Sequence, residues 1–188
     1  PLQDALPILK SFISGGVTSY IYVTKVKTDD NSISTLVIEK YSKRLSSGEP
    51  EKKMGWNSQP TSQVFFEDCK VPVENLIGKE GDGFKFAMMG LDGGRLNIAA
   101  CSLGTAQSAY ERAVNYVNER EQFGKKIQEF QALQFKLADM ATDLEASRLI
   151  LRDAAQKVDE NTPDKTKAAA MAKRFVTDAC FNVVNEAL

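Results

Sequence analysis

FQALQFKLADMATDLEASRLILRDAAQKV, residues 130–158, carries apolar residues at alternating steps of three and four along the chain. This spacing predicts one face of an α-helix, because a helix completes a turn every 3.6 residues. A helix of this length would measure roughly 43 Å, which is long for a compact single-core domain. The pattern is typical of a seam in a helical bundle, and the length indicates a bundle shared between subunits. The seam positions, one of them polar, are Phe130, Leu133, Leu137, Met140, Leu144, Ser147, Leu151, Ala154 and Val158.

Helical patterns also flank this segment. Residues 82–117 repeat apolar positions at close to the 3.6-residue period. The tripeptide Thr162–Asp164 predicts the start of a third helix, with Pro163 at the first helical position. That helix has two apolar faces, which indicates burial on two sides, and its pattern runs to Leu188. We therefore expect an incomplete four-helix bundle that needs more chain or another subunit. The faces are Ala168, Ala172, Phe175, Ala179 and Val183, and Phe181, Val184 and Leu188.

The chain before residue 80 has a different pattern, in which short β-rich runs alternate with turns. The predicted strands are Tyr20–Lys27, Ser34–Glu39 and Gln63–Glu67, and the predicted turns are Asp29–Asn31 and Ser46–Gly48. This order predicts the α+β class, with a mostly antiparallel β segment followed by long helices. We expect a partial β domain over residues 1–80 and a helical bundle, with three of its helices, over residues 81–188.

The composition narrows the class of protein. Of the 188 residues, 43% are hydrophobic and 26% are charged, which is typical of a globular chain. Lys and Arg number 24 against 25 Asp and Glu, so the near-zero net charge argues against a general nucleic-acid binder or a polybasic membrane binder. No apolar run approaches the ~20 residues of a membrane helix. The chain starts at Pro1 with no signal peptide or Arg-rich presequence, and we expect it to be a processed or cut piece.

The absence of histidine excludes whole mechanisms, among them the Ser-His-Asp triad, the Cys-His pair and the histidine metal site. Cys69, Cys101 and Cys180 are far apart and form no CxxC pair, so reduced thiols are expected and no metal site is predicted. Any chemistry must therefore depend on carboxylates, arginine, hydroxyls, backbone groups or a bound cofactor.

Two glycine-containing segments lie at the start of the helical region. Gly78–Gly83 reads as a turn entering a helix, with Asp82 as its N-cap. Asp92–Arg95 places two adjacent glycines inside a helix, at a cost of ~1 kcal/mol each relative to alanine. Close helix packing or a kink would explain them. The alternative is that a bulky ligand needs the space, with Arg95 as a fixed cation beside it.

The connection REQFGKKIQEFQ, residues 120–131, has the composition of a ligand-binding surface. Its arginine suits a phosphate, and its phenylalanine offers a flat face to a ring system. Gln131 supplies an amide in the next helix. Each of Arg120, Gln122, Phe123 and Gln131 alone could be an ordinary loop or helix residue, and Gly124 could simply end a helix. Their clustering at one bundle end favours a binding role.

Several longer motifs together resemble one known family. GWNSQPT, VFFEDCKVP, EGDGF, GGRLNIAACSLG, REQFG and FKLADMAT occur in the order found in acyl-CoA dehydrogenases, and the resemblance covers about residues 8–188. The similar branch acts on short branched-chain substrates such as isobutyryl-CoA, in valine catabolism. The resemblance implies FAD, an acyl-CoA thioester and a glutamate that removes the α-proton while the β-hydrogen leaves as hydride. It also implies electron-transfer flavoprotein as a partner, a middle β-barrel-like domain, a C-terminal four-helix bundle and a homotetramer.

The resemblance assigns roles to positions that match the family's motifs. It implies that a flavin-contacting strand includes Phe12, Ile13 and Ser14. It implies that the acyl-CoA site is lined by Asp92, Gly93, Gly94 and Arg95. It implies that a loop with Arg120, Gln122 and Phe123 reaches the FAD of a neighbouring subunit. It implies that Phe130 and Gln131 make a second contact with that FAD.

The departures from the family concern catalysis. The family has two known places for its catalytic glutamate, and Gly94 occupies the first while the second lies beyond Leu188. Residues 1–7 do not match the family. We therefore expect no catalytic residue within this chain, an incomplete flavin site and negligible dehydrogenase activity for the chain alone. The resemblance implies the mitochondrial matrix for a eukaryotic source and the cytoplasm for a bacterial one.

Two other readings of the function stay open at this stage. The chain could be a non-catalytic truncated form that offers its helices to intact subunits. It could also be a helical-bundle adaptor with no flavin connection.

Overall fold

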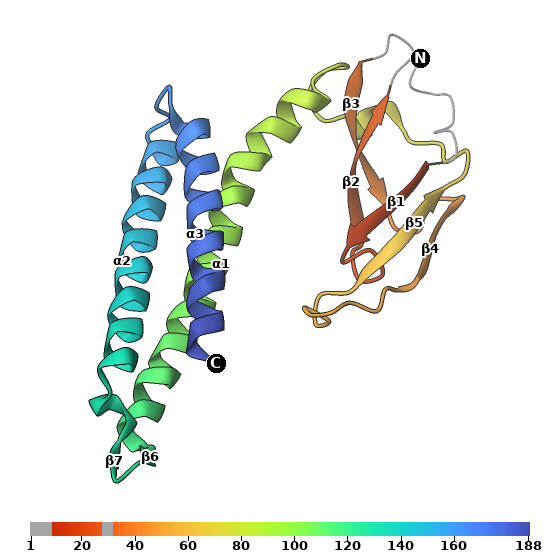
Figure 1. Ribbon diagram of the computed structural model, residues 1–188. Coiled ribbons are helices and arrows are strands. Elements are labelled where there is room, and N and C mark those ends of the chain that lie inside the picture. Colours follow the sequence, from red (N-terminus) through yellow and green to blue (C-terminus); the bar gives the residue numbers. More distant parts are fainter. Residues whose placement is uncertain (1–8, 28–31) are drawn as a thin grey trace. The chain divides into compact units, whose positions relative to one another are not determined.

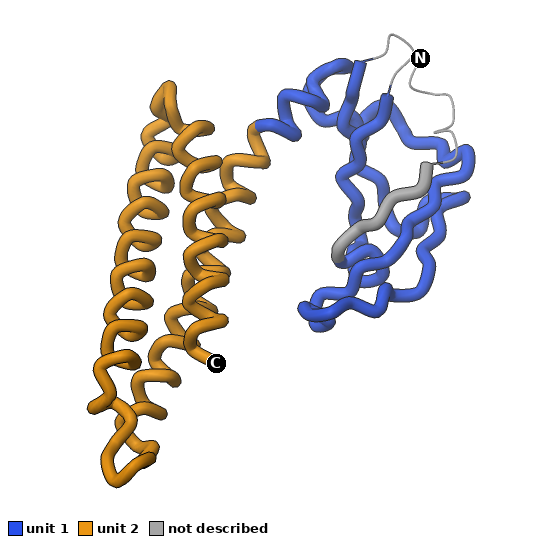
Figure 2. Tube along the Cα trace, in the orientation of Figure 1, with its two compact units in different colours: residues 1–88 blue, residues 89–188 orange. Residues whose placement is uncertain are grey.

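The computed structural model describes residues 9–27 and 32–188, with the side chains of residues 9–14 outside the description. The chain divides into two compact units, residues 1–88 and 89–188, and each is described by itself (Figure 2). The turn predicted at Asp29–Asn31 lies outside the described residues. The architecture is α+β, with antiparallel strands followed by three long helices, as predicted (Figure 1).

The first unit contains two antiparallel sheets, formed by the strands β1 (Leu9–Ser14), β2 (Ile21–Lys27), β3 (Ile33–Glu39), β4 (Leu45–Pro50) and β5 (Thr61–Phe66). In one sheet β1 and β4 flank β5, and in the other β2 pairs with β3 through a register that joins Ile21 to Glu39 and Lys27 to Ile33. The described strands close no barrel. The predicted strands are confirmed to within two residues at each end.

The prediction of a turn at Ser46–Gly48 is wrong, because these residues belong to strand β4. Leu45, Ser46 and Ser47 pair with Phe66, Phe65 and Val64 of β5, and the register shifts between Ser47 and Pro50. The small polar residues have low strand propensity, but pairing with a buried neighbouring strand overrides local preference. Pro50 ends the strand at the outer edge of this sheet, where a missing N–H donor is tolerated.

Alternating residues of β2, β3 and β5 form the core of the first unit. Buried positions alternate with exposed ones along β2, as expected for a sheet with one solvated face. Tyr22 and Phe66 meet edge to face, with ring centroids 6.4 Å apart. The buried members are Tyr22, Val26, Leu36, Ile38, Val64, Phe66, Cys69 and Val71.

Thr35 of β3 carries a buried hydroxyl without a hydrogen-bond partner. Thr35→Val keeps the shape of the side chain and its strand preference, so we expect the free energy of unfolding of the first unit to rise by about 1 kcal/mol. Urea titration followed by the fluorescence of Trp56, the single tryptophan, measures this unit. As a control, Thr18→Val removes a hydroxyl that donates to the Gly15 carbonyl, and no stabilisation is expected there. A loss of stability in Thr35→Val would contradict the prediction.

The helices are α1 (Gly83–Glu119), α2 (Gln131–Asp159) and α3 (Lys165–Ala187), and Figure 1 shows them side by side in the second unit. The predicted seam of α2 is confirmed, since its buried residues are Met140, Leu144, Ser147 and Ala154. All three helices contribute to the core of this unit. Its buried members are Ala99, Ala106, Met140, Leu144, Val176, Cys180 and Val183.

The start of α3 differs from the prediction. The helix begins at Lys165, and Pro163 lies in the preceding turn rather than at the first helical position. Hydrogen bonds hold this turn, because the Thr162 hydroxyl donates to the Asp164 carboxylate at 2.8 Å. Lys157 forms an ion pair with the same carboxylate at 3.2 Å. These contacts keep the turn out of the helix.

The buried face of α3 also differs from the prediction. The buried stripe runs through Ala169, Ala172, Val176, Ala179, Cys180 and Val183. Phe175 was expected on that stripe but is 41% exposed, and Phe181 of the second predicted face is 68% exposed. The structure therefore leaves large apolar side chains of α3 at the surface of the second unit.

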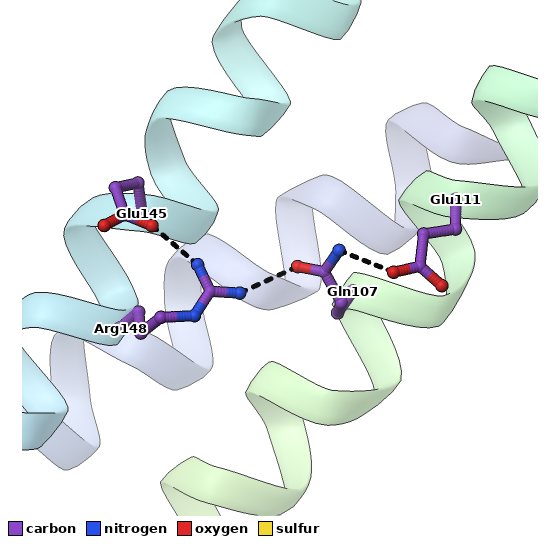
Figure 3. Close-up of polar contacts among 4 residues, drawn as sticks. All are labelled: Gln107, Glu111, Glu145 and Arg148. Carbon is purple, nitrogen blue, oxygen red and sulfur yellow. Dashed lines mark hydrogen bonds and ion pairs between the residues drawn. The ribbon is translucent and has the colours of Figure 1, made fainter.

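A polar bridge joins α1 to α2 (Figure 3). The Arg148 guanidinium of α2 donates to Gln107 Oε1 of α1 at 2.9 Å and to Glu145 at 2.7 Å. Gln107 in turn donates to Glu111 at 2.8 Å. Because these groups are partly solvated, the bridge contributes mainly to the register of the two helices.

Candidate functional site

The connection between α1 and α2 is a β-hairpin. Strands β6 (Glu121–Gln122) and β7 (Lys125–Lys126) pair through Gln122 and Lys125, which leaves a two-residue loop. Phe123 and Gly124 in that loop have φ angles of 55° and 79°, the left-handed pair that a type I′ turn requires. Gly124 therefore does not simply end a helix. It completes a tight turn at one end of the bundle (Figure 1).

The hairpin presents most of its predicted ligand-binding residues to solvent. Phe123 is 91% exposed although it is a large apolar residue, and Arg120, Gln122 and Gln131 are exposed beside it. The Phe123 ring meets Phe130 edge to face, with centroids 6.2 Å apart. The structure thus brings together the predicted set at this bundle end.

Sequence reasoning missed Lys125. Its ammonium lies 4.3 Å from the centroid of the Phe130 ring, a cation–π contact between the hairpin and the residue that precedes α2. The signal that could have found it is proximity in the sequence, because Lys125 and Phe130 lie five residues apart in the same short connection. Lys125 adds positive charge to the connection that carries Arg120, which is predicted to meet a phosphate.

A phenylalanine in a left-handed conformation costs roughly 1–2 kcal/mol. The Phe123 ring touches Phe130 only edge to face and, at 91% exposure, buries little surface to offset this cost. Phe123→Asn creates Asn-Gly, the preferred sequence of this turn. We expect the free energy of unfolding of the second unit to rise by about 0.5–1 kcal/mol, measured by circular dichroism at the helical minimum. Gly124→Ala should instead lower that free energy by about 1 kcal/mol, because a residue with a Cβ atom is strained at a φ angle of 79°. A decrease in Phe123→Asn would show that the ring supports the fold.

The second predicted segment lies within α1. The Asp92 side chain is only 9% exposed and accepts a hydrogen bond from Arg95 at 3.0 Å and another from the Thr166 hydroxyl of α3 at 2.7 Å. A Cβ atom added at Gly93 or Gly94 would meet nothing within 4 Å. Close packing within the described chain therefore does not account for the two glycines, and a kink or space for a ligand are the explanations that remain.

The third predicted set lies in β1 of the first unit. Phe12, Ile13 and Ser14 pair with Gln63, Ser62 and Thr61 of β5, so the expected strand is present. Their side chains lie outside the description.

The turn before α1 shows how that helix begins. The Asp82 carbonyl accepts from the Phe86 N–H, as expected at a helix start, but its carboxylate turns back to accept from the Lys79 N–H. Asp82 therefore occupies the N-cap position directly before Gly83, as predicted, and its carboxylate holds the turn that precedes the helix.

The cysteines take no part in these sites. Cys69 and Cys180 are buried and Cys101 is exposed, and all three are free. Burial raises the pKa of the Cys69 and Cys180 thiols. Within residues 9–27 and 32–188, no group of three possible metal ligands comes together. None of the helices in that part of the chain has the length and apolar character of a membrane span.

Comparisons with known proteins identify the class. The family model described as "Acyl-CoA dehydrogenase, C-terminal domain" matches residues 81–188, and the chain belongs to the acyl-CoA dehydrogenase family. The relatives include the mitochondrial isobutyryl-CoA dehydrogenase of Dictyostelium discoideum, 51% identical over 183 residues, which cover 95% of this chain and 44% of the relative.

Solved structures agree with this assignment. Butyryl-CoA dehydrogenase from Megasphaera elsdenii superimposes with a TM-score of 0.90 at 41% identity, covering 95% of this chain and 48% of that one. A chain in a structure of the electron transferring flavoprotein of Acidaminococcus fermentans gives a TM-score of 0.92 at 44% identity, covering 98% and 50%. The chain thus spans about half the length of the proteins that it matches.

Proposed function

We propose that this chain is part of an FAD-dependent dehydrogenase that introduces an α,β double bond into a short branched-chain acyl-CoA such as isobutyryl-CoA. Acyl-CoA dehydrogenases depend in general on FAD, which supplies the hydride acceptor when bound. The observation that carries the proposal is the hairpin, because its exposed Phe123 is held in a conformation that costs free energy and lies beside Arg120. Such strain is typical of functional sites.

The residues of the hairpin fit a dinucleotide. Arg120 would pair with a pyrophosphate, Phe123 and Phe130 would pack on a flat ring, and Gln122 and Gln131 would donate amide hydrogen bonds. In the proposed assembly the cofactor that the hairpin reaches is held mainly by another subunit. Phe12, Ile13 and Ser14 are proposed as part of a flavin-contacting strand. The proposed domains are a partial β domain over residues 1–80 and a helical bundle over residues 81–188. The family match, which begins at residue 81, supports this boundary.

The substrate site of the proposal is the α1 segment Asp92, Gly93, Gly94 and Arg95. Gly94 has no side chain, and both oxygens of Asp92 accept hydrogen bonds, so neither is assigned as the general base. We therefore propose that the 188-residue chain alone has negligible dehydrogenase activity. The whole enzyme is proposed to pass electrons to electron-transfer flavoprotein, to assemble as a homotetramer and, in a eukaryote, to act in the mitochondrial matrix in valine catabolism.

The flavin contact is tested in a mixed assembly. The tagged chain is co-expressed with an untagged intact member of the same family, and the flavin absorbance of the purified assembly is measured. Arg120→Ala should weaken flavin retention about tenfold, because a charge-assisted hydrogen bond is lost. Arg112→Ala on α1 is the matched control, since Arg112 is exposed and outside the hairpin. Equal flavin retention in both variants would reject the proposed contact.

A second candidate function is that of a non-catalytic partner of intact subunits. A surface groove between α2 and α3 is lined by apolar side chains, among them Ile150, Met171 and Phe175. It also carries Arg174 and Asp178, opposite charges that a homologous subunit could match. Phe175→Ser should abolish co-purification with the intact subunit under this alternative. Flavin retention, rather than co-purification, distinguishes the first proposal from this one.

A further inference from the structure

The Asp92 carboxylate connects two helices to one arginine. Arg95 Nη1 donates to Asp92 Oδ1 at 3.0 Å, within α1. Thr166 Oγ1 donates to Asp92 Oδ2 at 2.7 Å from α3, 74 residues further along the chain. Thr166 is the second residue of α3, so the carboxylate lies at the N-terminal end of that helix, where a negative group is favoured.

The Asp92 and Arg95 side chains differ in their exposure to solvent. The side chain of Asp92 is 9% exposed, and a carboxylate with so little solvent needs hydrogen-bond partners. The Arg95 side chain is 32% exposed. A guanidinium has five N–H donors, so the bond to Asp92 leaves others for an anionic or carbonyl ligand. Gly93 and Gly94 are exposed at the helix surface, and a Cβ atom at either would meet nothing within 4 Å.

We infer that Thr166 is a positioning residue of the acyl-CoA site. By holding the Asp92 carboxylate, it fixes the orientation in which Arg95 presents its remaining donors to the thioester ligand. The identity of that ligand rests on the proposed function, whereas the control of Arg95 by Thr166 rests on the three side chains alone.

The test uses the full 188-residue chain with isobutyryl-CoA as the probe. Calorimetry measures the dissociation constant, and NMR measures how fast the Arg95 guanidinium group rotates. Thr166→Val removes the donor and should weaken binding about tenfold and speed the rotation. Thr166→Ser keeps the donor and should match the wild type. Thr177→Val is the control, because its hydroxyl donates only to carbonyls of its own helix.

The outcomes separate this inference from the proposed function. If Thr166→Val lowers the melting temperature but leaves both the affinity and the rotation unchanged, Thr166 is merely structural and the inference is overturned. If the wild-type chain does not bind isobutyryl-CoA, the proposed substrate role of the α1 segment fails. The rotation then decides: faster rotation in Thr166→Val than in Thr166→Ser supports the positioning role, and equal rotation overturns it.

Discussion

Replacing Phe66 with alanine is expected to lower the free energy of unfolding of the first unit by about 3–5 kcal/mol. Phe66 is fully buried at the end of β5, and its ring meets Tyr22 edge to face. The substitution removes a large apolar surface and leaves a cavity that two hydrogen-bonded sheets cannot fully close. Urea titration followed by Trp56 fluorescence measures the loss.

Phe123→Ala is the matched control for Phe66→Ala. The same atoms are removed from a ring that is 91% exposed, so the free energy of unfolding should change by less than about 0.5 kcal/mol. Phe66 would then be required for the fold, and Phe123 would be available for a ligand. Comparable losses in the two variants would show that the Phe123 ring is buried in the free chain, which contradicts the hairpin geometry.

Gly83→Ala is expected to destabilise the first unit by about 2–3 kcal/mol. Gly83 is the first residue of α1, and a Cβ atom there would lie 2.6 Å from the carbonyl oxygen of Ile33. The obstacle is backbone of β3, which cannot rotate away as a side chain could. Thermal melts and urea titrations with Trp56 fluorescence measure the effect.

Gly90→Ala, in the same helix, should have the opposite sign. A Cβ atom at Gly90 meets nothing within 4 Å, so alanine gains only its higher helix propensity, about 1 kcal/mol. Destabilisation by both substitutions to the same extent would show that the contact between Gly83 and Ile33 does not determine the outcome.

Local periodicity explains which parts of the fold could be predicted. The α2 seam through Met140 and Leu144 follows from a 3.6-residue repeat, and the alternation in β2 follows from a two-residue repeat. Both signals act between near neighbours in the chain. The clustering of Arg120, Gln122 and Phe123 was also readable, because all of them lie in one short connection.

Contacts between distant segments explain what could not be predicted. Ser46 and Ser47 have the composition of a turn, and only pairing with β5 makes them a strand. Phe175 fits the apolar spacing of α3, but the packing of the neighbouring helices places Val176 in the core and leaves Phe175 at the surface. In both cases the local residues are compatible with two structures, and contacts with neighbouring elements determine which of the two forms.

The amino-acid sequence by itself determined the helices, the main strands and the bundle end that carries the proposed cofactor contacts, since each depends on interactions over a few residues. The tertiary structure alone decided that Asp92 is held by Thr166. A hydrogen bond needs its two groups within a few ångströms. Only the folded chain brings together a carboxylate on α1 and a hydroxyl 74 residues away.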